Sequence, residues 1–138
     1  MKKLLLITSI FISTELVSQT KNHSSFDYVH TNIESVILND TVKLAISLLE
    51  NYTNSKATYL VLYILDGKWF FSQGAALQTH FSRYKITPDL IIVEIENTST
   101  QRNWYFNESE KFNQFLEQEL IPTLDKGFRT NQERLLFG

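Results

Sequence analysis

Residues 59–65 read YLVLYIL, and this stretch carries no charged side chain. A strand that is apolar at every position is expected to be covered on both faces, as the central strands of a parallel sheet are. The run ends at Asp66-Gly67, a pair that is typical of a tight turn. The rest of the chain therefore has to supply the elements that cover this strand.

Helical and strand patterns alternate after this turn. Mostly apolar residues between Phe70 and Tyr84 recur at steps of 4, 3, 4 and 3, a stripe that predicts a helix over residues 68–84. Residues 90–95 read LIIVEI and predict a second, mostly apolar strand. Residues 134–137 read RLLF and predict the start of a third buried strand.

The clearest helical pattern covers residues 109–126, where apolar side chains share one face and charged side chains the other. Pro122 is expected to kink this helix near its end, because proline cannot donate a hydrogen bond to the residue four positions earlier. Gly127 is a suitable residue to end it. Residues 97–107 are polar and show no clear period, so the sequence predicts an irregular loop there.

A β-hairpin is predicted before the apolar strand. Residues 33–38 are rich in β-formers, Asn39-Asp40 favours a turn, and residues 41–48 alternate between polar and apolar. The predicted order is thus a hairpin followed by β-α-β-α-β. Alternation of strands with helices of this length indicates an α/β fold.

The N-terminus has the features of a signal peptide. Lys2 and Lys3 precede a short, mostly apolar run over residues 4–12, which is too short to span a bilayer. We expect cleavage after Ser18, with Thr20 as the alternative position, which would leave a secreted or periplasmic protein without a membrane anchor. The alternative is that this segment forms a strand or helix of the core.

Composition bounds the remaining domain, residues 19–138. The full chain has a net charge of −2 and an isoelectric point near 5.9, and no basic stripe is present, so no nucleic-acid partner is expected. The absence of cysteine excludes a disulfide framework and a cysteine-based zinc site. His23, His30 and His80 are too dispersed to predict a metal site, and no cofactor is expected.

Four segments carry a resemblance to a known family. They are residues 59–67 (YLVLYILDG), 90–98 (LIIVEIENT), 115–122 (FLEQELIP) and 134–138 (RLLFG), in this order. Together they resemble the putative-esterase branch of the α/β-hydrolases, which includes S-formylglutathione hydrolases and iron-siderophore esterases. The chain departs from the pattern at Glu94, where the family often has glycine.

The resemblance implies the N-terminal portion of an α/β-hydrolase sheet, truncated before the nucleophile elbow. Such enzymes cleave small-molecule carboxylic esters with a serine, a histidine and an acid, and the serine lies in a G-x-S-x-G turn. The four glycines of this chain include no pair four residues apart, so the motif is incomplete. Gly138 would be its first glycine. We therefore expect the nucleophile just after Gly138 and no activity from this chain alone.

The resemblance also assigns residues around the site. It points to the backbone N–H of Lys68 as one donor of the oxyanion hole, with Gly67 shaping the turn. The alternative is that Asp66-Gly67 only reverses the chain. Arg102 and Trp104 follow the second strand at an edge where α/β sheets bind ligands, so they are candidates for substrate contact. Packing of a surface loop is the alternative for both.

Two function classes remain open from the sequence. One is the front portion of a secreted serine esterase. The other is a non-catalytic relic, or an α/β module that binds a small molecule in the crevice at the strand ends. In either case the last strand would expose an apolar edge, which predicts marginal solubility.

Overall fold

The computed structural model describes residues 28–65 and 67–138, so the predicted signal peptide, residues 1–18, lies outside the described residues. Short 3₁₀ and π-helical segments, η1 and η2, interrupt the regular elements. The elements in chain order are β1 Tyr28–Ser35, β2 Asp40–Ser47, η1 Tyr52–Asn54, β3 Tyr59–Ile64, α1 Gly67–Arg83, β4 Leu90–Glu96, α2 Ser99–Asn107, α3 Ser109–Phe115, η2 Leu116–Leu120, α4 Ile121–Gly127 and β5 Thr130–Phe137.

The five strands form one mixed sheet in the order β1-β2-β4-β3-β5. β1 and β2 make the predicted hairpin, and β2 runs antiparallel to β4. β3 lies between β4 and β5 and is parallel to both. The predicted α/β class and the order of the strands along the chain are confirmed. The apolar run over residues 59–65 accounts for an interior strand.

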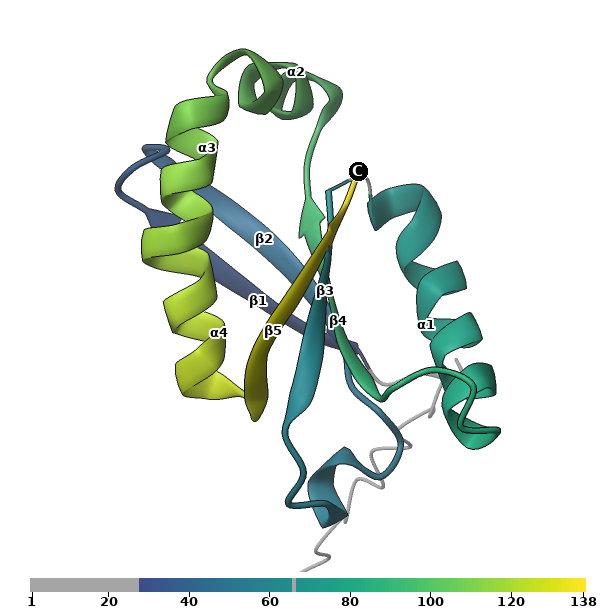
Figure 1. Ribbon diagram of the computed structural model, residues 1–138. Helices are drawn as coiled ribbons and strands as arrows, with labels where there is room; N and C mark the ends of the chain where they lie inside the picture. The colour runs from purple at the N-terminus through teal and green to yellow at the C-terminus, as the bar shows by residue number, and fades with distance from the viewer. Residues whose placement is uncertain (1–27, 66) are drawn as a thin grey trace, which may run out of the picture.

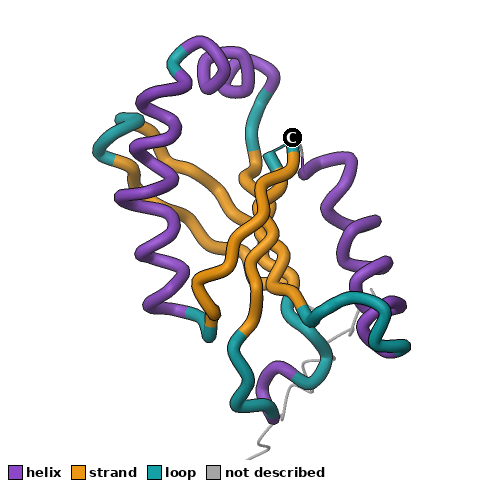
Figure 2. Tube along the Cα trace, viewed as in Figure 1, coloured by secondary structure: helices purple, strands orange, loops and turns teal. Residues whose placement is uncertain are grey.

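Helices cover both faces of the sheet, as Figures 1 and 2 show. α1 packs on one face, where Phe71 lies in a small buried cluster with Ala45, Ile64 and Ile92. The continuous helical stretch α3–η2–α4 covers the other face and contributes Phe115 to a much larger cluster. Among the described helices, none is both long and apolar enough to cross a bilayer.

The loop predicted over residues 97–107 is wrong, because most of it forms α2. Thr98 caps this helix: its hydroxyl accepts a hydrogen bond from the Gln101 N–H at 3.2 Å. The Gln101 side chain accepts one in return from the Thr98 N–H at 2.9 Å. This reciprocal capping box, T-x-x-Q, is a local signal that the sequence reading overlooked.

The disturbance expected at Pro122 takes the form of the π-helical turn η2, which directly precedes α4. Pro122 is the second residue of α4, which continues η2 without a break, so its missing N–H leaves out one hydrogen bond inside the helical stretch. α4 ends at Gly127, as predicted.

The third parallel strand begins earlier than predicted, at Thr130. Its register against β3 shifts between Tyr59 and Val61, and Gln132 adopts a positive φ of 69°. This irregularity hides the strand pattern in the sequence. Beyond it, Leu135, Leu136 and Phe137 remain 51%, 57% and 50% exposed.

Candidate active site

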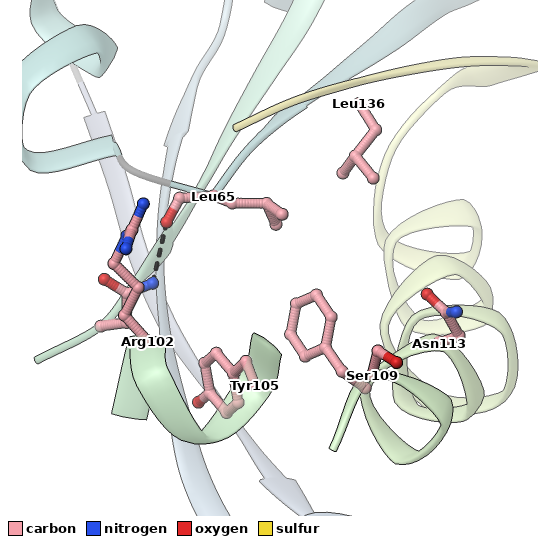
Figure 3. Close-up of a pocket in the computed structure, with 8 residues that line it drawn as sticks. Leu65, Arg102, Tyr105, Ser109, Asn113 and Leu136 are labelled. Carbon is pink, nitrogen blue, oxygen red and sulfur yellow. Dashed lines mark hydrogen bonds between the residues drawn. The ribbon is translucent and has the colours of Figure 1, made fainter. Parts of the chain in front are cut away.

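The carboxyl ends of the three parallel strands meet at one rim of the sheet. The Leu65 N–H, after β3, donates to the Phe137 carbonyl at the end of β5 over 2.8 Å. The Asn97 side chain, after β4, donates to the Leu65 carbonyl over 2.9 Å, the bond drawn in Figure 3. These hydrogen bonds hold the turn after β3, the loop after β4 and the end of β5 together.

Gly138 lies against the turn after β3. A Cβ atom at Gly138 would lie 2.8 Å from the Leu65 Cβ, so a larger residue would collide with that side chain. Figure 1 shows the C-terminal residue beside the start of α1. The structure therefore brings Gly138 and the Gly67 turn to the same rim.

Gly67 is buried and is the first residue of α1, and Lys68 follows it in the first turn. The first four N–H groups of a helix have no acceptor within the helix. The Lys68 N–H is one of these groups, so it can donate to a ligand. A Cβ atom at Gly67 would lie 2.0 Å from the Glu94 Cγ, which leaves room only for glycine.

Glu94 supports this turn from β4. Its side chain is only 8% exposed. Burial raises the pKa of the Glu94 carboxyl above its ordinary value, Glu96 raises it further, and His30 acts in the opposite direction. Glu94 departs from the family pattern, and the sequence alone predicts no role for it.

A mainly apolar cleft of about 160 Å³ opens next to this turn (Figure 3). Arg102 from α2 lies on its wall, as Figure 3 shows. Tyr105 and Phe112 stack with ring centroids 4.7 Å apart and form another part of the wall. The lining residues are Leu65, Asn97, Arg102, Tyr105, Ser109, Phe112, Asn113 and Leu136.

Tyr105 is one of the residues of this cleft that the sequence does not predict as a site residue. Its side chain is buried and its hydroxyl has no hydrogen-bond partner among the described residues. Burial, followed by the nearby Asp40 carboxylate, raises the pKa of the Tyr105 hydroxyl. The capping signal at Thr98 indicates a helix. In a helix Arg102 and Tyr105, three residues apart, lie on the same face.

Trp104 lies away from the cleft lining. It packs beside the large core cluster, and its ring lies 5.8 Å from the Lys111 Nζ. The two candidates for substrate contact are thus separated: Arg102 lines the cleft and Trp104 does not. In the described part of the chain, no group of three or more acidic or histidine side chains could hold a metal ion.

Comparison with known families matches residues 35–138 to the putative esterase family. The chain belongs to this family. A search of curated proteins found no match.

Solved structures resemble the chain over most of its length. The IroE-like serine hydrolase from Shewanella oneidensis has 27% identity and a TM-score of 0.68, over 80% of this chain and 42% of its own. The BES protein from Bacillus cereus has 21% identity and a TM-score of 0.71, and the match covers 100% of this chain and 54% of the BES protein. The enterochelin esterase from Shigella flexneri has 18% identity and a TM-score of 0.64, and the match covers 75% of this chain and 26% of the esterase. The chain thus spans about half or less of these proteins.

Proposed function

We propose that this chain is the N-terminal part of a secreted serine hydrolase that acts on small carboxylic esters, and that residues 1–138 have no esterase activity by themselves. One observation carries the proposal: Gly138 and the turn that begins α1 lie at one rim, with Gly138 against Leu65. Acyl transfer needs a nucleophile next to the carbonyl carbon and N–H donors about 3 Å from the carbonyl oxygen.

In this proposal each described residue has a limited role. The Lys68 N–H supplies one hydrogen bond to the oxyanion, and Gly67 lets the backbone approach. The cleft beside Leu65 takes the apolar part of the ester, and Arg102 lies at its wall. The serine, the acid and the histidine come from outside residues 1–138.

The first test is hydrolysis of p-nitrophenyl acetate and butyrate by the purified chain. We expect no turnover above the buffer blank, because the chain contains no G-x-S-x-G turn. Turnover that a serine-directed phosphonate abolishes would contradict the proposal. Mass spectrometry of the exported protein tests secretion, and we expect an N-terminus at Gln19.

The second test supplies the missing residues. In a chimera, residues 35–138 replace the matching region of the IroE-like serine hydrolase, and ester hydrolysis is measured after a cooperative thermal transition confirms folding. We expect an active chimera. A folded chimera without activity would show that this chain cannot form its share of an esterase site.

The donor role of Lys68 can be isolated in this chimera. Lys68→Pro removes the N–H, and proline is tolerated in the first turn of a helix. We expect kcat to fall by about 10² to 10³, the effect of losing one oxyanion donor. Lys68→Ala is the matched control, because it keeps the N–H and should keep kcat. Equal rates for the two variants would assign the turn a purely structural role.

A second candidate is a non-catalytic module that binds a small molecule, because all the residues that line the cleft belong to this chain. A cavity of similar size in another protein accepts a ring as large as benzene. Titration of the chain with benzoate, followed by NMR shifts of the Tyr105 and Phe112 rings, tests this candidate. If the module binds anionic aromatic compounds, we expect benzoate to shift these resonances and Arg102→Ala to weaken the shifts. If it does not bind them, we expect no shifts.

A further inference from the structure

Glu94 is the one charged residue among the buried side chains of the described residues. It lies in β4 with Ala45 opposite it in β2 and Ile64 beside it in β3. Both neighbours belong to the small apolar cluster beneath α1. An apolar side chain at this position would fill the same space without any loss of hydration, so the carboxyl group calls for an explanation.

The contacts of Glu94 lead to the first residue of α1. The position of a Cβ atom on Gly67 lies 2.0, 2.4 and 2.6 Å from the Cγ, Cδ and Oε1 atoms of Glu94. The carboxyl group therefore packs directly against the Gly67 backbone. It lies where the first N–H groups of the helix have no partner within the helix and the helix dipole is positive.

Among the side chains that the structure describes, few charged groups face this carboxyl. Glu96 lies two residues along β4, and His30 of β1 lies 3.5 Å from the Glu96 carboxylate, measured from its Nδ1 to Oε1. Lys43 of β2 is the partner of Glu96 across the sheet. The first turn of α1 contains no acidic residue. A buried carboxyl with few compensating charges, next to a candidate site, is a common feature of functional groups.

We propose that Glu94 is a positioning residue for the Gly67–Lys68 turn, and that its proton controls how well this turn stabilises an oxyanion. The neutral side chain holds Gly67 by packing and adds no charge. The ionised side chain places a negative charge near the atoms on which negative charge develops in the transition state, and so opposes it. This inference rests on the proposed function of the turn.

The coupling can be measured in the chain itself, without any catalysis. The amide ¹⁵N and ¹H shifts of Gly67 and Lys68 are followed between about pH 4 and pH 8. We expect both amides to titrate in the wild type and in Glu117→Gln, which changes an exposed carboxyl. We expect the change above about pH 5 to disappear in Glu94→Gln. Titration of both amides in Glu94→Gln as in the wild type would overturn the inference.

The functional part uses the active chimera of residues 35–138. We measure the kcat of Glu94→Gln and divide it by the kcat of Glu117→Gln at each pH. The catalytic histidine titrates in both variants, so its effect cancels in this ratio. We expect this ratio to rise from near one at about pH 4.5 to between about fivefold and tenfold at about pH 8. A ratio that stays constant over this range overturns the role of the Glu94 proton and leaves the proposed function standing. An inactive chimera counts against the proposed function, while the amide titration still decides the coupling.

Discussion

The two faces of the sheet differ in how much buried apolar surface they carry. Among the described residues, sixteen buried side chains form the cluster beneath α3–η2–α4, and four form the cluster beneath α1. The lightly packed face is the one that contains the buried carboxyl of Glu94 and the turn that begins α1. Elements with few buried contacts are the ones that open and adjust most easily. The heavily packed face supplies Tyr105 and Phe112 to the wall of the cleft, whereas the lightly packed face carries the contact between Glu94 and Gly67. We therefore infer that the turn that begins α1 adjusts more easily than the wall of the cleft.

The largest expected effect tests this difference directly. Phe115 is fully buried beneath α3–η2–α4, and Phe71 is 3% exposed beneath α1. We expect Phe115→Ala to lower the free energy of unfolding by about 5 kcal/mol and Phe71→Ala by about 3 kcal/mol, the two ends of the usual range. Urea unfolding of both variants measures this. Equal losses, or a larger loss for Phe71→Ala, would remove the basis of the comparison.

The next prediction concerns the turn on the lightly packed face. Gly67→Ala places a methyl group on the Glu94 side chain, and we expect it to lower the free energy of unfolding by about 2–3 kcal/mol. The double variant with Glu94→Ala should recover most of this loss, because the three atoms nearest to the added methyl group all belong to Glu94.

Gly127→Ala is the matched control for this prediction. No atom lies within 4 Å of the position that its Cβ would take. We expect an unchanged or slightly raised free energy of unfolding, by up to about 1 kcal/mol. If thermal unfolding shows the same loss for both glycines, the contact with Glu94 is not its cause.

The third prediction concerns a link between the β1–β2 turn and the helix on the heavily packed face. The Glu119 carboxylate of η2 accepts hydrogen bonds from the Val36 and Ile37 N–H groups at 3.0 and 3.2 Å, and also from the Ser35 hydroxyl. Glu119→Ala removes this link between the β1–β2 turn and the helix, and we expect it to lower the free energy of unfolding by about 2 kcal/mol. Glu117→Ala, an exposed neighbour, should change it by less than about 0.5 kcal/mol. Similar values in urea unfolding would show that the link does not stabilise the fold.

The smallest expected effect is a pH dependence on the α1 face. The folded-state pKa of Glu94 is raised above its ordinary value of 4.5, chiefly by burial, so the folded state binds the proton more tightly than the unfolded state does. The stability that comes from this proton is present below the ordinary pKa and is lost as the pH rises through the raised one. We expect Glu94→Gln to unfold at a higher temperature than the wild type at about pH 7, and the difference to vanish in acid. Thermal melts with the opposite trend would contradict a raised pKa.

The two edges of the sheet also differ. β5 exposes Leu135, Leu136 and Phe137 at one edge, whereas β1 at the other edge exposes mainly polar residues. Exposed apolar strand edges favour association. The marginal solubility expected from the sequence remains a prediction, which light scattering of the purified chain tests.

The parts of the fold that depend on local pattern could be predicted from the sequence. The uninterrupted apolar run of β3, the period of α1 and the hairpin of β1 and β2 each follow from residues close together in the chain. α2 was missed because its apolar period is weak and its start depends on a capping box at Thr98. The early start of β5 was missed because a bulge breaks the alternation.

The sequence by itself determined the alternation of strands and helices, because a strand without charges must be covered and amphipathic helices must bury their apolar side. It also carried the four segments that resemble the esterase family. Only the tertiary structure decided that Gly138 meets Leu65, that Arg102 reaches the cleft while Trp104 does not, and that Glu94 packs on Gly67. The physical reason is that each of these contacts joins segments far apart in sequence, and the strand order and register of the sheet determine which distant residues meet.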